Sequence, residues 1–170
     1  MTSPPFKAVY NGLVVETPAL LEEHQPDLVI HIGLAVDRNY FAIERGADRY
    51  GYHEIPDEAR KVISRAENKR LFDIRPSRLD SCVGFGENLL ENWKKNFSNI
   101  VPRNHKNKKG KLLSKQIQSS TEVDLRLSDD VGNYVCGLLY YVSLKWFWSK
   151  DKSGMALFLH IPQLTGQAEL

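Results

Sequence analysis

The sequence contains few cysteines and no long apolar run. Its two cysteines, Cys82 and Cys136, are too few for a disulfide scaffold, and neither belongs to a Cys-x-x-Cys pair, so the sequence excludes a zinc ribbon or a thioredoxin-type site. No stretch approaches the roughly 20 apolar residues of a membrane-spanning helix, and the start lacks the basic and apolar regions of a secretory signal. We therefore expect a soluble cytoplasmic protein with no membrane contact.

The sequence also lacks an excess of charge of either sign. Its 23 basic and 21 acidic side chains give a formal net charge of +2, which excludes a wholly basic nucleic-acid-binding protein. Residues 101–118 nevertheless contain no acid and several cations, namely Arg103, Lys106, Lys108, Lys109, Lys111 and Lys115. No aromatic residue is interleaved with them as a platform for bases, so we expect a flexible, solvated insertion loop, with nucleic-acid contact as the less favoured alternative.

The sequence does contain enough apolar residues for a core, at 42% of the total. Its length of 170 residues predicts a single domain, 1–170. Apolar runs at 27–33, 40–44 and 155–162 predict strands, and the first of these reads as a strand buried on both faces, as in parallel sheets. Residues 121–127 alternate in polarity and predict a half-exposed strand.

Three other segments predict helices. Thr17 to His24 combines a cap residue, a proline at a first-turn position, good helix formers and early acids, which together indicate the end of a helix-forming stretch. Residues 87–100 carry apolar side chains on one face, and Val135 begins a segment with apolar residues at i, i+3, i+4 and i+7 that ends before residue 150. The charged stretch 56–81 predicts one short helix and loops. Strands alternating with helices indicate an α/β domain with a largely parallel sheet.

Three residues of this pattern could carry chemistry. Cys136 lies in the first turn of the last predicted helix, where unpaired N–H groups and the helix dipole lower a thiol pKa and can hold an oxyanion. His160 and Glu44 lie at the ends of predicted strands. Because the carboxyl ends of parallel strands and the amino ends of the following helices share one edge, these side chains could meet as nucleophile, general base and orienting carboxylate.

Each of these residues also has an ordinary structural interpretation. Cys136 could be a small core residue, His160 a hydrogen-bonded structural histidine, and Glu44 the ion-pair partner of the arginine beside it. His31 is a rival histidine inside a predicted strand, and Cys82 is a weaker candidate nucleophile because no helix start follows it closely. Spacing alone leaves these alternatives open.

Three blocks of sequence resemble the pyroglutamyl peptidase I family of cysteine exopeptidases, which remove an N-terminal pyroglutamyl residue from peptides. Residues 25–45 are similar to the family's strand, glycine and catalytic glutamate, residues 128–144 to the segment around its cysteine, and residues 156–162 to the strand with its histidine. The similarity covers residues 8–57 and 121–164, on either side of the basic segment.

The resemblance implies a fold and a set of site residues. The fold is a three-layer αβα sandwich around a mostly parallel twisted sheet, of the phosphorylase/hydrolase-like type, in an incomplete form. Glu44, Cys136 and His160 correspond to the catalytic triad, and Tyr134 and Val135 to a remaining part of the substrate pocket. No metal and no organic cofactor is implied, because the thiolate supplies the chemistry.

The chain departs from the family pattern in the substrate pocket and at both ends. The family's N-terminal Thr-Gly-Phe-x-Pro-Phe-Gly loop is missing, Leu34 replaces a glutamine, Glu54 replaces an arginine, and the chain stops at Leu170, soon after the histidine strand. The resemblance therefore predicts a shortened chain with an exposed sheet edge that favours self-association into a homo-oligomer.

Two functions follow from these matches and departures. The first is a cysteine-type omega exopeptidase, whose partners are peptides with N-terminal pyroglutamate. The alternative is a catalytically impaired, truncated relative that keeps only the scaffold.

Overall fold

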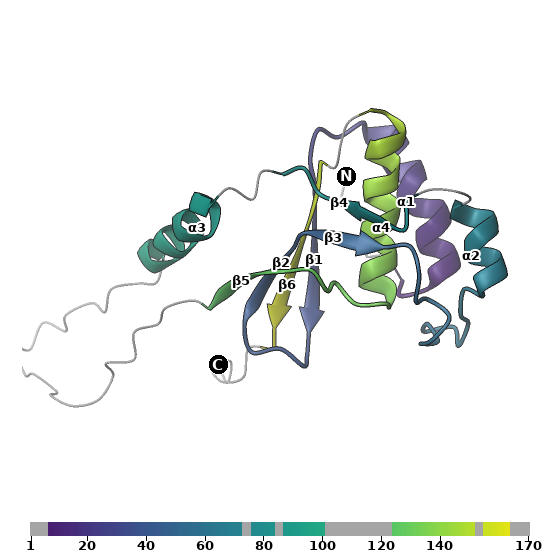
Figure 1. Cartoon of the computed structure of the whole chain (residues 1–170), viewed down its shortest axis with the longest axis horizontal. Helices are drawn as coiled ribbons and strands as arrows, with labels where there is room; N and C mark the ends of the chain where they lie inside the picture. Colours follow the sequence, from purple (N-terminus) through teal and green to yellow (C-terminus); the bar gives the residue numbers. More distant parts are fainter. Residues whose placement is uncertain (1–6, 73–75, 84–86, 101–123, 152–154, 164–170) are drawn as a thin grey trace, which may run out of the picture.

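A mixed four-stranded sheet lies at the centre of the structure (Figure 1). The computed structural model describes residues 7–72, 76–83, 87–100, 124–151 and 155–163. The strands are β1 (Val29–Ala35), β2 (Phe41–Glu44), β5 (Leu125–Ser128) and β6 (Ala156–Pro162). They are arranged in the order β1-β6-β2-β5, with β1 parallel to β6, β5 parallel to β2, and β2 antiparallel to β6. Two of these three pairings are parallel, which confirms the predicted α/β class with a mostly parallel sheet.

Four helices and a second, two-stranded sheet complete the described structure. The helices are α1 (Tyr10–His24), α2 (Arg65–Phe72), α3 (Glu87–Ile100) and α4 (Val135–Ser149). The small sheet pairs β3 (Gly46–Asp48) with β4 (Arg78–Asp80) in antiparallel fashion. The segment 101–118, predicted as a basic insertion loop, lies outside the described residues. Among the described helices, none is long and apolar enough to cross a membrane.

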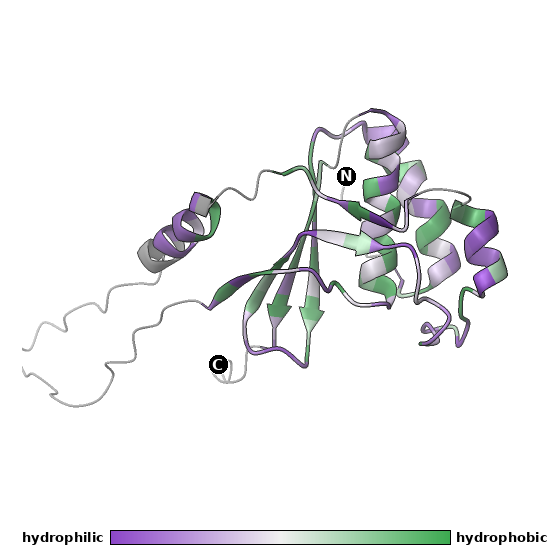
Figure 2. Cartoon of the chain, viewed as in Figure 1, coloured by the Kyte–Doolittle hydropathy of each residue, from purple (hydrophilic) through white to green (hydrophobic). Residues whose placement is uncertain are grey.

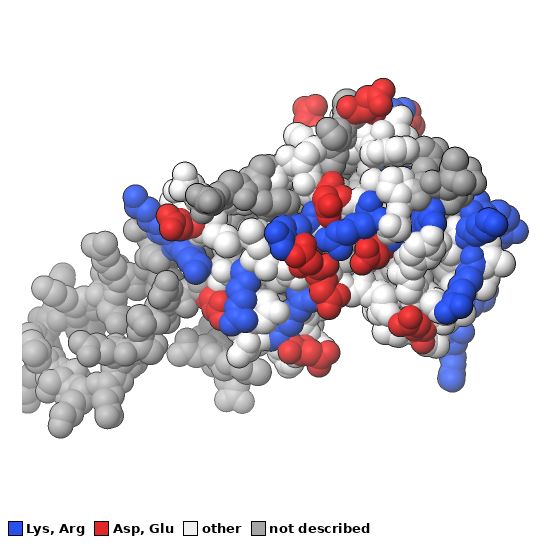
Figure 3. Space-filling view, in the orientation of Figure 1, with Lys and Arg blue, Asp and Glu red and all other residues white. Residues whose placement is uncertain are grey.

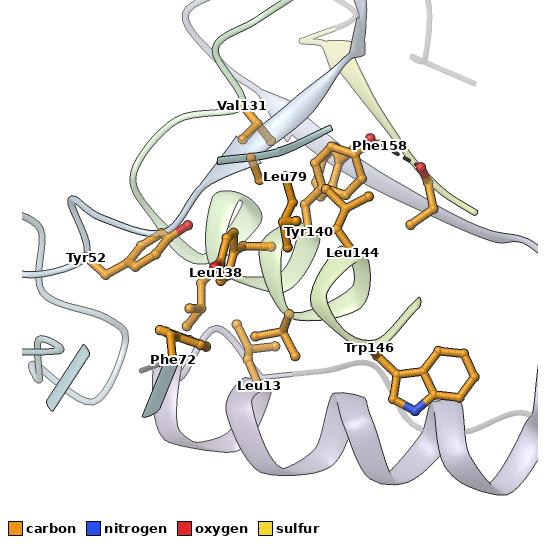
Figure 4. Close-up of a cluster of buried hydrophobic side chains, with 14 of the residues drawn as sticks. Leu13, Tyr52, Phe72, Leu79, Val131, Leu138, Tyr140, Leu144, Trp146 and Phe158 are labelled. Carbon is orange, nitrogen blue, oxygen red and sulfur yellow. Dashed lines mark hydrogen bonds between the residues drawn. The ribbon is translucent and has the colours of Figure 1, made fainter. Parts of the chain in front are cut away.

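One face of the main sheet packs against α4, and α1 covers α4 from outside (Figure 4). Leu13 of α1, Leu138 and Leu144 of α4 and Phe158 of β6 are buried in one apolar cluster. Because α4 is enclosed by the sheet and by α1, it is apolar around most of its circumference, as a central helix must be.

The other face of the sheet carries a smaller apolar cluster. Ile43, Leu125 and Leu157 are buried there, and Leu90 and Trp93 of α3 pack against them. Helices therefore pack against both faces of the sheet, as the family resemblance implies.

The first helix contains the predicted segment Thr17 to His24 as its C-terminal part. It begins at Tyr10, so Pro18 lies inside the helix instead of in its first turn. The residue before the helix provides no side-chain cap; instead, the distant carboxylate of Asp57 accepts a hydrogen bond from the Tyr10 amide at 2.9 Å. Because the capping carboxylate is 47 residues away in the sequence, the residues around the start of the helix give no sign of it.

The prediction that the first strand is buried on both faces is wrong. Along β1, exposed residues alternate with half-buried ones, and Ile32 is 67% exposed. The reason is position: β1 is the edge strand of the sheet, and its second face is left uncovered by the described helices.

The half-buried face of β1 places His31 against α4. A hydrogen bond of 2.9 Å joins its Nε2 to the hydroxyl of Ser143, which is fully buried, and its ring lies 5.8 Å from that of Phe158. Burial lowers the pKa of His31 to about 4. His31 is therefore neutral near pH 7 and is bound to the core through Ser143.

We expect acid to destabilise the fold through His31. In the unfolded chain this histidine gains a proton near pH 6.5, whereas in the folded chain it does so near pH 4. Stability is therefore lost as the pH falls from about 6.5 to about 4, by roughly 2–3 kcal/mol. Urea denaturation across this range should show a flatter pH dependence in His31→Gln and the wild-type dependence in His24→Gln, whose side chain is exposed. Equal pH dependence in all three proteins would refute this account.

Two helical glycines differ in the space around them and form a matched pair. A Cβ at Gly137 in α4 would lie 2.0 Å from the carbonyl oxygen of Gly132, whereas one at Gly12 in α1 would approach only the flexible Glu16 side chain, at 3.4 Å. We expect Gly137→Ala to destabilise the protein by at least 1–3 kcal/mol through overpacking, and Gly12→Ala to stabilise it by about 0.5–1 kcal/mol. Urea denaturation measures both changes. A tolerated Gly137→Ala would contradict the close approach of loop and helix.

Candidate active site

The carboxylate of Glu44 and the imidazole of His160 form a buried pair between β2 and β6. Glu44 is the last residue of β2 and is fully buried, and His160 is 5% exposed. The antiparallel register of the two strands brings them close enough for His160 Nδ1 to lie 2.8 Å from Glu44 Oε1. Two of the three predicted site residues are thus in direct contact.

The surroundings of Glu44 decide its charge. Burial opposes ionisation, but the hydrogen bonds of His160, Ser128 and Arg38 and the positive charge of Arg38 outweigh it and lower the pKa of the Glu44 carboxyl. An ionised carboxylate can only accept a hydrogen bond, so the Nδ1–H of His160 donates to it. In the neutral imidazole, Nε2 then carries the free lone pair and can accept a proton.

Cys136 lies in the first turn of α4, as predicted. The helix begins at Val135, and Tyr134 before it gives no side-chain cap. The loop before the helix contains Gly132, which adopts a φ of +82°, and Asp130, whose Oδ1 accepts a hydrogen bond from the Gly132 amide at 3.0 Å. The half-buried thiol of Cys136 therefore belongs to a helical turn whose N–H groups have no partner within the helix.

Gly33 connects the cysteine with the histidine strand. It is in register with His160 across the β1–β6 pairing. A Cβ at this glycine would lie 3.2 Å from Cys136 Sγ and 2.8 Å from the Phe158 ring, whose centroid is 4.7 Å from that of His160. The absence of a side chain at Gly33 lets the thiol approach this side of the sheet, although no hydrogen bond joins Cys136 and His160 in the structure.

The electrostatic surroundings of Cys136 differ from the expectation. The helix position predicts a lowered thiol pKa, but burial and the negative charge of Glu44 raise the pKa of Cys136. In this arrangement a proton acceptor is needed to form the thiolate. The open lone pair of His160 Nε2 is the group on this side of the sheet that fits that role.

The role of Arg38 has no signal in the sequence. Its Nη1 lies 2.6 Å from Glu44 Oε1, and its Nη2 donates to the backbone carbonyl of Asp130. The arginine thereby fixes the buried carboxylate to the loop that leads to Cys136. The expected alternative, an ion pair of Glu44 with Arg45, is wrong, because Arg45 pairs with Asp129.

Arg78 also forms hydrogen bonds with the loop before Cys136. It donates to the carbonyl of Asp129 at 3.1 Å and also pairs with Asp48 and Asp80. Figure 3 shows basic and acidic side chains interleaved on this face, with no single sign of charge dominating. Exposed pairs of this kind contribute little stability each, so we assign them to holding the loop in place.

The predicted pocket residues Tyr134 and Val135 pack against the apolar cluster under α4. The ring of Tyr134 meets that of Tyr10 edge-on at 6.0 Å. A cavity of about 600 Å³ is lined by Tyr50, Tyr52 and Glu54 among others, and neither Tyr134 nor Val135 is among its lining residues. A substrate role for Tyr134 and Val135 stays a prediction.

The remaining candidates lie apart from this site. Cys82 is an exposed free cysteine. The described residues contain no group of three or more histidine, cysteine, aspartate or glutamate side chains placed to hold a metal ion.

Comparison with known proteins gives consistent matches. The chain is 31% identical over 160 residues to the pyrrolidone-carboxylate peptidase of Brevibacillus brevis, covering 94% of this chain and 61% of that protein. It is 24% identical over 147 residues to human pyroglutamyl-peptidase 1, covering 86% of this chain and 54% of the relative. No protein-family model matches the chain. The chain thus spans between about half and three fifths of the length of these relatives.

Solved structures agree in fold. A mutant pyrrolidone carboxyl peptidase (A199P) from Pyrococcus furiosus superposes with a TM-score of 0.64 at 21% identity, over 94% of this chain and 63% of the other. The E192D mutant of the same protein gives a TM-score of 0.62 at 21% identity, over 92% and 62%. The resemblance found in the sequence is therefore confirmed: over most of its length, this chain is similar in sequence to pyrrolidone-carboxylate and pyroglutamyl peptidases and shares the fold of the solved ones.

Proposed function

We propose that Cys136, His160 and Glu44 form a catalytic triad and that the protein is a cysteine exopeptidase that removes N-terminal pyroglutamyl residues from peptides. The observation that carries the proposal is the buried Glu44–His160 hydrogen bond of 2.8 Å. Burying an ionised carboxylate costs free energy unless nearby groups compensate its charge. In the proposed triad the carboxylate of Glu44 orients the imidazole of His160 and stabilises its protonated form. The cytoplasmic location is part of the same proposal.

The reaction proceeds in two acyl transfers. His160 Nε2 takes the thiol proton of Cys136, and the thiolate attacks the carbonyl carbon of the pyroglutamyl residue. The C–N bond to the next residue breaks, the amine leaves with the proton returned by His160, and a thioester remains. Water then attacks the thioester while His160 removes its proton, which releases pyroglutamate and restores the thiol.

Three features of this chain support these steps. The Nδ1–H of His160 donates to Glu44, which keeps Nε2 as the proton acceptor and stabilises the imidazolium when it forms. The uncapped first turn of α4 offers N–H groups for the oxyanion. Tyr134 and Val135, which precede Cys136, offer apolar side chains to a lactam, which has no free amine, and such surroundings disfavour the charged N-termini of other peptides.

A second candidate function has its own observations. The raised pKa of Cys136, the missing hydrogen bond to His160 and the replacement of the family's arginine by Glu54 favour a catalytically impaired relative that keeps the scaffold. Glu54 accepts a hydrogen bond from the Asn133 side chain at 2.5 Å, so this carboxylate stands next to the loop before the cysteine.

Substitution in the triad tests the proposed activity. Cleavage of a pyroglutamyl-coupled fluorogenic substrate by the full chain should vanish in Cys136→Ala and His160→Ala, and fall about 10²–10⁴-fold in Glu44→Gln, with the fold retained by circular dichroism. Cys82→Ala should leave turnover unchanged. Unchanged turnover in Cys136→Ala would refute the assignment, and a wild-type chain that is folded but inactive would favour the scaffold alternative.

Thiol reactivity separates the two candidates without a substrate. If His160 accepts the proton of Cys136, iodoacetamide at neutral pH should alkylate Cys136 at least 10-fold faster than the exposed Cys82. His160→Ala should remove the difference, because the thiol then has no base. Mass spectrometry of the two cysteine-containing peptides measures both rates. A folded chain in which Cys136 reacts no faster than Cys82 supports the impaired relative.

A further inference from the structure

One buried hydroxyl lies against both strands of the Glu44–His160 pair. Tyr140 of α4 is fully buried, and most of this helix is hydrophobic or near neutral in hydropathy (Figure 2), so its hydroxyl needs a specific partner. The hydroxyl oxygen lies 3.0 Å from the backbone carbonyl oxygen of Glu44, at the end of β2. It also lies 3.3 Å from that of Ala156, at the start of β6. Tyr140 therefore connects α4 with the two strands that carry the pair.

The two carbonyls lie where the main sheet divides. β2 pairs with β6 as far as Glu44, and the chain then enters the small sheet, which begins at Gly46. The hydroxyl of Ser81 donates to the Ala156 carbonyl at 2.5 Å. Because a hydroxyl carries one proton, Tyr140 donates to Glu44, at the shorter of its two distances. This hydrogen bond holds the end of β2 at a fixed position relative to α4.

Tyr140 is also connected to the cysteine, through the helix. It follows Cys136 by four residues in α4, so the two side chains lie on one face of the helix. The ring of Tyr140 packs beside that of Phe158 at 5.7 Å, and the Phe158 ring lies 4.7 Å from the imidazole of His160 (Figure 4). Tyr140 thus contacts the elements that position the thiol, the imidazole and the carboxylate.

We propose that Tyr140 is a positioning residue of the site: its hydroxyl holds α4 at the distance from β2 and β6 at which His160 takes the proton of Cys136. The inference rests on the proposed function. Since Cys136 and His160 come from the helix and the sheet, their approach depends on how α4 lies against the strands. Burial raises the pKa of the Tyr140 hydroxyl, so it stays protonated and able to donate at neutral pH.

The next residue along the helix provides a matched control. Tyr141 is also fully buried in α4, but its hydroxyl donates to the backbone carbonyl of Pro76 at 2.9 Å, and Pro76 belongs to neither β2 nor β6. Tyr140→Phe and Tyr141→Phe each remove one oxygen atom and leave a backbone carbonyl without its tyrosine donor. The two variants should therefore lower the urea midpoint by similar amounts.

Steady-state kinetics of the full chain on a pyroglutamyl-coupled fluorogenic substrate test the inference. Tyr140→Phe should lower kcat about 10-fold and leave KM within about 2-fold, because small misplacements of the reacting atoms slow the chemical step whereas the substrate contacts remain. Tyr141→Phe should keep the kcat of the wild type. A wild-type kcat in Tyr140→Phe, or an equal loss of kcat in both variants, would overturn the inference.

A second measurement needs no turnover and separates this inference from the proposed function. The imidazole ¹H and ¹⁵N signals of His160 should move in Tyr140→Phe, because the end of β2 with Glu44 shifts, and should match the wild type in Tyr141→Phe. Unmoved His160 signals in Tyr140→Phe overturn the inference whatever the turnover. A folded wild type without turnover refutes the proposed function alone, and the His160 signals then decide whether Tyr140 positions the pair.

Discussion

The buried carboxylate of Glu44 is the constraint on which the rest of this structure depends. A fully buried charge is tolerated only with close partners, and Glu44 has the imidazole of His160 and the guanidinium of Arg38. Each partner comes from a different part of the chain. Arg38 reaches on to the loop before Cys136, and the Tyr140 hydroxyl of α4 donates to the Glu44 carbonyl at 3.0 Å. Through its carboxylate and its backbone carbonyl, Glu44 thereby links β2, β6, α4 and the loop before Cys136.

Close packing around two glycines completes this arrangement. Gly33 leaves room for the Cys136 thiol and the Phe158 ring, and Gly137 lets the loop carbonyl of Gly132 touch the helix. A side chain at either position would push the thiol away from the histidine strand. The geometry of the site thus depends on the lack of a side chain at these two glycines as well as on the charged groups.

The sequence predicted the elements that have strong local patterns. The last helix, the strands at 41–44 and 156–162 and the helix at 87–100 are confirmed, because their apolar periodicity reflects burial that the fold realises. It failed where the cause is distant in sequence, as in the start of α1, which Asp57 caps, and the exposed face of β1. The contact of Glu44 with His160 followed from family resemblance, whereas Arg38 was missed because its two partners become neighbours only in the folded chain.

The central claim is that ionised Glu44 holds the Nδ1–H of His160 and leaves Nε2 to take the proton of Cys136. Long-range ¹H–¹⁵N NMR of the imidazole in the full chain at neutral pH tests this claim directly. The account predicts a proton on Nδ1 of His160 that is shifted downfield by its hydrogen bond and loses that shift in Glu44→Gln. A His160 ring with a bare Nδ1 and its only proton on Nε2 would contradict it.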